Sequence, residues 1–234
     1  MSKTIFLFGI SLLVLLPLNA AWSQFGLKGG LAASGFQLSH NSSSSTGNDY
    51  RPFLGYEVEW MQESDAPGAD LGLQIGIFYA KDFSKYFAVQ PELYYSQRGL
   101  HFYQTELYNS VYSLNVDYVE VPVLLKFKIP LNWRVKPGLL AGPYAAFKLR
   151  ANRTLRIWEE QNTKRVSSVN DLDYGLVFAI DSKFSAWSRQ LLFEIRFNWG
   201  LASMMAQPKE FIDLYDDAGR VNVLAFTFLT GIEF

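Results

Sequence analysis

The feature that most constrains the fold of this chain is a strict alternation of apolar and polar side chains over long segments. Near 190–203, one face would carry Leu191, Phe193, Ile195, Phe197, Trp199 and Leu201, and the other Leu192, Glu194, Arg196, Asn198 and Gly200. Successive residues of a β-strand point to opposite faces, so the pattern predicts strands. Such long strands are typical of membrane-spanning barrels, whose faces meet lipid and lumen, whereas soluble strands usually stop after about five or six residues.

The same period predicts eight strands, near 25–38, 70–81, 86–104, 112–129, 132–150, 172–184, 190–203 and 221–234. The connections alternate in length: those at 82–85, 130–131 and 185–189 are short, those at 39–69, 155–171 and 204–220 are long, and that near 103–111 is intermediate. Short periplasmic turns alternate with long outer loops in this way. We therefore predict an all-β fold, an eight-stranded antiparallel up-and-down transmembrane β-barrel.

The first residues predict export. Lys3 precedes an apolar run, Ile5 to Leu18, that is too short to span a bilayer as a helix. Ala21 and Ser23 are small residues suited to a cleavage site, so residues 1–23 are expected to be a cleavable signal peptide and 24–234 the barrel domain of a Gram-negative outer-membrane protein. An N-terminal membrane anchor is the alternative.

Composition narrows the function. The chain has no Cys, which excludes disulfides, thiolate zinc sites, a cysteine nucleophile and a lipidated cysteine. The net charge of −1 does not favour a nucleic-acid partner, which usually requires a basic stripe. Aromatic residues make up 16% of the chain, and no later segment is apolar enough for a transmembrane helix. A soluble sandwich and a membrane barrel remain, and the strand lengths favour the barrel.

Charged residues on the polar faces should point into the lumen. An eight-stranded barrel is only wide enough inside for side chains, and an unpaired buried charge is very costly. We therefore expect a polar network of ion pairs that makes the barrel rigid; a narrow ion pathway or ligand cavity is the alternative, and a general porin would need roughly 16 strands. The expected members are Lys28, Glu92, Glu120, Lys126, Lys128, Arg134, Lys136, Lys148, Asp181, Lys183, Glu194, Arg196 and Glu233.

Four prolines lie inside the predicted strands. They are Pro91, Pro122, Pro137 and Pro143. Because a proline cannot donate a ladder hydrogen bond, we expect these positions to be confined to bulges or rims. The predicted faces could slip by one residue around each of them.

Catalytic residues are scarce. The chain has two histidines: His40 lies in the first outer loop and His101 near the outer end of a strand. Ser110 or Ser113 could lie across the hairpin from His101, so a small hydrolase acting at the rim is the enzymatic alternative. A lone histidine there is more often a surface residue, and we expect no catalytic, cofactor-binding or metal site.

Two long loops carry opposite charge. Asp213, Asp216, Asp217 and Gly219 in the last loop lack the spacing of a calcium-binding loop and predict a solvated acidic segment. The basic third loop could bind that segment, lipopolysaccharide phosphate or an envelope protein. Its basic residues are Arg150, Arg153, Arg156, Lys164 and Arg165, and the apolar residues that favour a protein contact are Ile157, Trp158, Phe211, Ile212 and Tyr215.

Five segments form an ordered set of motifs: residues 87–99 (FAVQPELYYSQRG) and 117–126 (DYVEVPVLLK) lie in two successive predicted strands, and 138–144, 173–177 and 196–201 follow them. In this order, these segments resemble strands of the PorT-like outer-membrane β-barrel family. Residues 25–31 are similar to its first strand, and the first outer loop is longer than usual for the family. The resemblance implies an eight-stranded barrel. The family's namesake belongs to a protein-secretion apparatus, so it also implies a scaffold or accessory subunit.

The last strand has two expected roles. It should close the barrel by pairing with the strand that starts at Phe25, which removes the free edge. Gly231, Ile232 and Phe234 resemble the signal that the barrel-insertion machinery recognises, and Phe234 should lie in an aromatic girdle at the periplasmic rim. The expected partners are thus outer-membrane lipid, the insertion machinery and envelope proteins.

Overall fold

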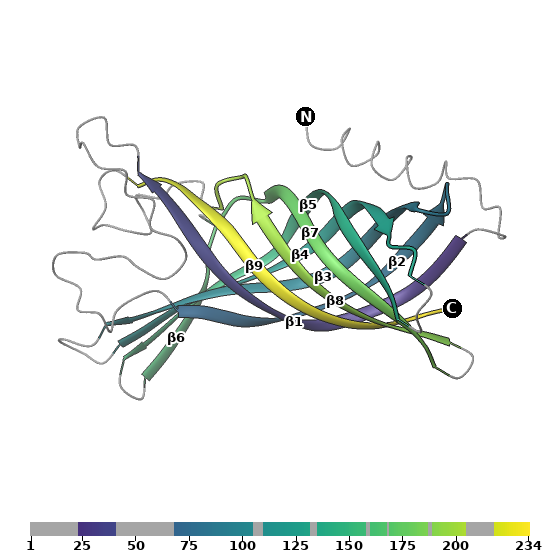
Figure 1. Ribbon diagram of the computed structural model, residues 1–234. Coiled ribbons are helices and arrows are strands. Elements are labelled where there is room, and N and C mark those ends of the chain that lie inside the picture. The colour runs from purple at the N-terminus through teal and green to yellow at the C-terminus, as the bar shows by residue number, and fades with distance from the viewer. Residues whose placement is uncertain are drawn as a thin grey trace.

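The computed structural model describes residues 23–40, 68–104, 110–131, 135–157, 160–167, 169–186, 189–204 and 218–234. In these residues the chain forms nine strands (Figure 1). They are β1 (Ser23–His40), β2 (Gly68–Asp82), β3 (Phe87–Gln104), β4 (Ser110–Lys128), β5 (Val135–Ile157), β6 (Glu160–Arg165), β7 (Leu172–Ala186), β8 (Arg189–Gly200) and β9 (Ala218–Glu233). No helix in the described part of the chain is long and apolar enough to cross a membrane.

Eight of these strands close into an antiparallel barrel. The pairing order is β4-β3-β2-β1-β9-β8-β7-β5, and β5 pairs back to β4. The first and last strands meet, with Gly26 opposite Glu233 and the N–H of Phe234 donating to the carbonyl of Phe25 at 2.8 Å. The predicted eight-stranded antiparallel barrel, closed between its first and last strands, is confirmed.

The two ends of the barrel differ. One end, which we call the terminal end, carries the start of β1, the end of β9 and the short turns (Figure 1). In the turn after β2, Ser84 Oγ accepts a hydrogen bond from the N–H of Phe87 at 2.9 Å. The opposite end, the loop end, carries the connections from β1 to β2, β3 to β4, β5 to β7 and β8 to β9. The long predicted connections therefore lie at the loop end, but the connection between β3 and β4, predicted to be intermediate, spans only 105–109 and is no longer than the turn between β4 and β5.

The two faces of each strand also follow the prediction. On β8, the residues from Leu192 to Gly200 that share the face of Glu194 are buried, while Phe193, Ile195 and Trp199 on the other face are exposed. Exposed apolar side chains cover the outside of the other strands in the same way. An apolar outer surface over a polar interior is the arrangement that a bilayer selects, since lipid offers no partner for a polar side chain.

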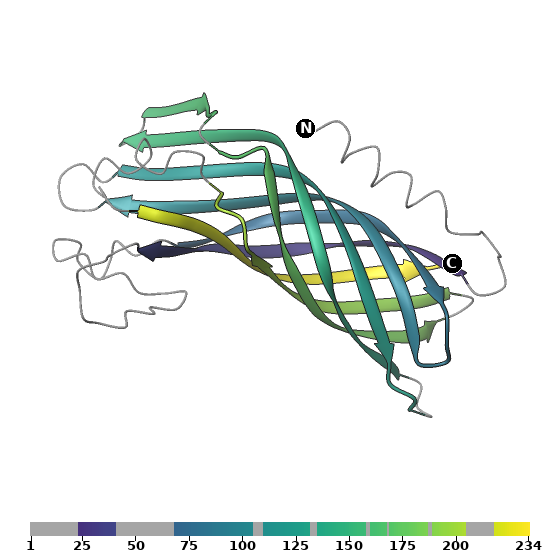
Figure 2. The same cartoon turned by 90° about the horizontal axis from the view of Figure 1, so that it is seen from above.

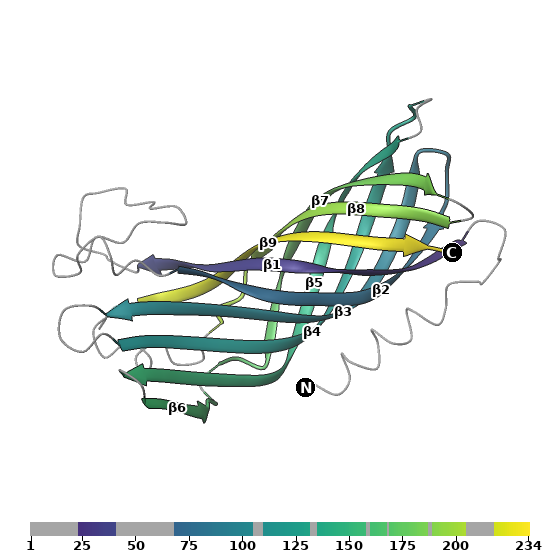
Figure 3. The ribbon, with the colours of Figure 1, turned by 90° about the horizontal axis from the view of Figure 1, so that it is seen from below.

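The end of the fifth predicted strand was wrong. Expected to stop at 150, β5 continues to Ile157 and pairs with β6, which lies inside the predicted 155–171 loop. In Figures 2 and 3, β6 lies at the edge of the strand ends that extend past the barrel. A bulge in β5 explains the error. Asp117 of β4 pairs with Arg150 and Tyr118 pairs with Lys148, so Leu149 of β5 has no partner on β4. Beyond the bulge, the positions of β5 that face outward are therefore the even-numbered ones instead of the odd-numbered ones.

The four prolines do not shift the register. Around Pro91, the pairing of β3 with both β2 and β4 is interrupted for two residues and resumes in the same register. The pairing of β4 with β5 likewise skips the partner of Pro143 and continues unchanged from Pro122 to Leu125. The expected confinement to bulges or rims is therefore wrong for Pro91, Pro122 and Pro143, because a paired barrel strand tolerates a missing donor when the ladder on either side holds its register. Pro137, the third residue of β5, does lie at a rim, the terminal end of the barrel.

Some predicted features lie outside the described residues. These are the predicted signal peptide up to residue 22 and the acidic residues Asp213, Asp216 and Asp217.

Candidate functional site

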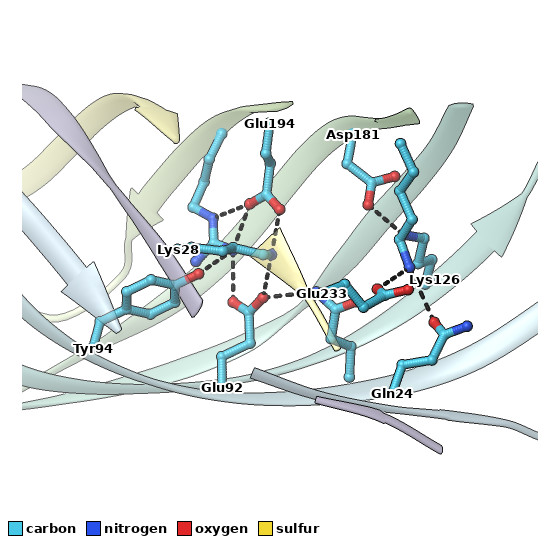
Figure 4. A network of polar contacts seen from close by, with 11 residues as sticks. Gln24, Lys28, Glu92, Tyr94, Lys126, Asp181, Glu194 and Glu233 are labelled. Atoms are coloured by element: carbon cyan, nitrogen blue, oxygen red, sulfur yellow. Dashed lines mark hydrogen bonds and ion pairs between the residues drawn. The ribbon is translucent and has the colours of Figure 1, made fainter. Parts of the chain in front are cut away.

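The lumen holds four charged side chains, which we call the central cluster: Lys28 of β1, Glu92 of β3, and Glu194 and Arg196 of β8. Figure 4 shows Lys28, Glu92 and Glu194 pointing toward one another. Lys28 Nζ lies 2.8 Å from Glu92 Oε1 and 2.5 Å from Glu194 Oε2. Arg196 Nη2 lies 2.6 Å from Glu92 and 2.5 Å from Glu194. All four side chains have 0% exposure. Two cations and two anions thus neutralise one another out of reach of solvent.

Aromatic rings pack beside the central cluster. The Arg196 guanidinium lies 5.0 Å from the ring centre of Tyr94, and Lys28 Nζ lies 4.7 Å from that of Phe78. Glycines make room for these rings, because a Cβ on Gly76 would collide with Tyr94 and a Cβ on Gly26 would collide with Phe78. The rings fill the lumen and offer their negative faces to the two cations.

A second cluster lies on the loop side and is centred on Arg98 of β3. Arg98 Nη2 lies 2.5 Å from Glu120 Oε2, and Nη1 lies 2.6 Å from Asp173 Oδ2. The Tyr144 hydroxyl donates to Asp173 at 2.9 Å, and the Asn198 amide donates to Glu120 at 2.8 Å. We call these five residues the loop-side cluster. It ties β3, β4, β5, β7 and β8 together across the lumen.

Two further ion pairs lie toward the terminal end. Lys126 contacts Asp181, and Lys183 contacts Glu233. Lys183 Nζ also donates to the side chain of Gln24 at 3.0 Å. The exposure of these charged side chains is at most 9%. The ion-paired interior therefore continues from the middle of the barrel to the first residues of β1.

An apolar layer covers the loop side of these clusters. Val169 and Met204 come from two connections and have exposures of 2% and 1%. Asn170 joins the connections, since its N–H donates to the Met204 carbonyl at 2.8 Å and its side chain to the Ser203 carbonyl at 2.7 Å. The other buried residues of this layer include Leu114, Val116, Ala151 and Val223.

The chain matches a known family over most of its length. Residues 20–206 match the model of the outer membrane protein beta-barrel domain. The chain belongs to that family. As an outer-membrane β-barrel, it has its short turns in the periplasm, so the terminal end is periplasmic and the loop end is extracellular.

Solved structures of outer-membrane proteins are similar to the chain at low identity. OprG of Pseudomonas aeruginosa is 12% identical with a TM-score of 0.46, and the match covers 92% of this chain and 96% of that one. Neisserial surface protein A is 10% identical with a TM-score of 0.44, covering 89% and 95%. Ail of Yersinia pestis is 13% identical with a TM-score of 0.40, covering 92% and 100%. A search of curated proteins finds no match.

The structure places most of the predicted lumen residues inside this outer-membrane β-barrel. Lys128 and Lys148 are half-buried and pair with Asp82 and Asp171, respectively, at 2.6 Å and 2.8 Å. Lys136 is exposed, which corrects its prediction: it has the inward register, opposite Lys183, but it is the second residue of β5 and lies at the periplasmic rim. Arg134 lies outside the described residues. The buried ones are Lys28, Glu92, Glu120, Lys126, Asp181, Lys183, Glu194, Arg196 and Glu233.

Among the described residues, the sequence prediction missed two charged side chains that are buried in the lumen, Arg98 and Asp173. Their exposures are 2% and 1%, and they hold the loop-side cluster together. The alternation contained the signal, because Arg98 shares the parity of Glu92 on β3 and Asp173 that of Asp181 on β7. Extending the alternation along each strand from Glu92 and Asp181 toward the loop end would have predicted both residues as inward-facing.

Other predicted residues lie near the extracellular end. His101 is directly opposite Ser113 in the pairing of β3 with β4, whereas Ser110 is opposite Gln104. His40 is the last residue of β1. At the periplasmic rim, Phe234 is 53% exposed and the Arg189 guanidinium lies 4.5 Å from its ring centre. The role of Gly231, Ile232 and Phe234 in insertion stays a prediction.

Proposed function

We propose that this outer-membrane barrel is non-enzymatic and non-conducting, and that it serves as a scaffold or accessory subunit of an envelope assembly through its extracellular segments. The resemblance to the PorT-like family supports placing that assembly among protein-secretion systems. The observation that carries the proposal is the complete burial of the central cluster, whose four side chains have 0% exposure.

Burial of the central cluster argues against a pore. A water-filled path through the lumen would run along its charged side chains and leave them accessible. Instead, the loop-side cluster, the central cluster and the pairs around Lys126 and Lys183 follow one another along the barrel, and the apolar layer around Val169 covers their extracellular side. Such paired charges fill the interior of the barrel, which in an eight-stranded barrel is only wide enough for side chains.

If the lumen neither conducts nor catalyses, the extracellular segments are the parts of the chain that can contact another protein. The hairpin of β5 and β6 extends past the barrel (Figure 2), and residues 161–165 of β6 are exposed. A hairpin on a rigid barrel holds a fixed position relative to the membrane. Such a surface suits the docking of an envelope protein, and the exposed edge of β6 offers backbone groups for that contact.

Co-purification from native outer membranes tests this proposal. One variant replaces residues 153–164 with Asn-Gly, because Asn152 and Arg165 are paired opposite each other and a two-residue turn can join them. It keeps Val166 and Val169, which pack in the apolar layer. After cross-linking, we expect the intact chain to retain a protein partner that the shortened variant loses. An unchanged partner set, or no partner, would refute the role of the hairpin.

Two measurements examine the rival functions. In planar bilayers, purified barrel should show no stepwise conductance; steady channels would establish transport instead. For the enzymatic rival, His101→Ala should leave lipid and peptide hydrolysis by purified protein at the level of an empty-vector preparation. Hydrolysis that the intact chain shows and His101→Ala abolishes would overturn the proposal, since His101 and Ser113 lie opposite each other.

A further inference from the structure

The outward face of the β5–β6 hairpin carries three arginines. Arg150 follows the bulge at Leu149, and its side chain is 56% exposed, whereas the next residue, Ala151, is buried. Arg156 and Arg165 are exposed, and the pairing puts them on the same face as Arg150, because Arg165 lies opposite Asn152 and facing residues share a side. We call Arg150, Arg156 and Arg165 the arginine face.

The height of the arginine face matches a membrane boundary. On the outside of β5, exposed apolar residues run from Leu139 at 44% exposure to Leu149 at 50%. At about 3.3 Å per residue and a tilt of about 40°, this stretch rises about 25 Å, the height of the apolar band of an outer-membrane barrel. Arg150 is the next residue, so the arginine face begins where the acyl chains of the outer leaflet end and their head groups start.

The charge of this surface is unbalanced. On the outward side of β4, β5 and β6, as far as these strands are described, Asp117 is the one acidic side chain. Arg150 already contacts it, with Nε at 2.9 Å and Nη2 at 2.7 Å from Oδ2. Hydroxyl groups accompany the arginines, since Thr154 Oγ1 and Thr163 Oγ1 lie 3.0 Å apart across the hairpin. The surface is therefore positive and rich in hydrogen-bond donors.

We infer that the arginine face binds the phosphate groups of the phosphorylated glycolipid in the outer leaflet. A guanidinium presents a planar set of donors that matches phosphate oxygens, and the position on the membrane normal brings those oxygens to it. The apolar stretch from Leu139 to Leu149 lies directly below and contacts the acyl chains of the same lipid. This inference does not depend on the scaffold role, because lipid binding needs the barrel alone.

Binding of lipid A by the full-length barrel in detergent tests the inference. The probe is bis-phosphorylated lipid A, and dephosphorylated lipid A is its comparison, with native mass spectrometry giving the bound fraction. The variant is Arg156→Gln with Arg165→Gln, which leaves the Arg150–Asp117 contact intact. The matched control is Lys85→Gln with Lys136→Gln, the same charge change at exposed residues of the periplasmic end.

We expect the intact barrel and the control to prefer the phosphorylated lipid. The variant should bind it more weakly by about fivefold per arginine removed, or about thirtyfold for both. The single substitutions repeat the measurement should the double variant fold poorly. Equal binding of both lipids, equal loss in the control, or unchanged binding by the variant would each overturn the inference. Displacement of the bound lipid A by free inorganic phosphate at the same concentration as the lipid would also overturn the inference.

Discussion

Substituting Lys28 by Met should destabilise the barrel strongly, and a second substitution should undo much of the damage. Lys28 contacts Glu92 and Glu194 at 2.8 Å and 2.5 Å, with all three side chains fully buried. Without it, two carboxylates share the single positive charge of Arg196, which leaves one uncompensated buried negative charge. Removing one partner of a buried ion pair typically costs about 3–5 kcal/mol. Met keeps the apolar stem of the side chain and limits any cavity.

The matched double variant, Lys28→Met with Glu194→Gln, leaves Arg196 and Glu92 as a neutral pair at 2.6 Å. The new glutamine amide oxygen can still accept a hydrogen bond from Arg196. We therefore expect the double variant to be at least about 2 kcal/mol more stable than the sum of the two single losses predicts. Denaturant unfolding in lipid vesicles, followed by tryptophan fluorescence, measures each free energy. A Lys28→Met loss below about 1 kcal/mol, or additive losses, would refute the compensated cluster.

Three further predictions rest on other contacts. Gly175→Ala places a Cβ against the Trp199 carbonyl and the Tyr144 ring, and should lower the free energy of unfolding by about 1–3 kcal/mol in a denaturant titration. The control is Gly29→Ala, whose Cβ would have its nearest contacts at 3.8 Å, and it should lower that free energy by less than about 0.5 kcal/mol. A hydrogen bond from Lys148 and its positive charge lower the pKa of the exposed Asp171. The ion pair therefore stabilises the folded state at a pH above the ordinary pKa of Asp, and this contribution is lost as the pH falls through the lowered pKa. An NMR titration should show a higher pKa of Asp171 in Lys148→Met. Phe234→Ala should lower the folded fraction in outer membranes more than Phe226→Ala, and equal yields would argue against the insertion signal.

The strands and faces of the barrel wall could be predicted from the sequence, because a bilayer requires the two-residue alternation of apolar and polar side chains. Each outward position must be apolar and each lumen position must fit a narrow interior, so a one-residue slip would reverse a whole strand. This constraint explains why the faces of β7, β8 and β9 and the closure between Phe25 and Phe234 could be predicted. It also explains why Pro91 and Pro143 cause no shift, since neighbouring strands on both sides hold the register.

The same constraint weakens where the strands leave the membrane. Past the bulge at Leu149 the polar residues Arg150, Asn152, Thr154 and Arg156 face outward, so the apolar outer face that marks a membrane strand ends, and β6 was expected to be loop. Partner choice inside the lumen was also beyond the sequence. Parity identifies Lys28 and Glu194 as inward, but their contact depends on the relative stagger of β1 and β8, two strands that are not paired with each other.

The long β5 links the two parts of the molecule on which the proposed function depends. In its lower part, the Tyr144 hydroxyl joins the loop-side cluster through Asp173, and Lys148 contacts Asp171 just before the bulge. In its upper part, the same strand carries Arg150 and Arg156 of the arginine face and pairs with β6, which carries Arg165. Because there is no break in the strand between Val135 and Ile157, the ion pairs that stiffen the lumen also fix the height and direction of the extracellular hairpin. Under the proposed function, the ion-paired lumen thus has a physical use: it holds an exposed surface at a constant position above the membrane.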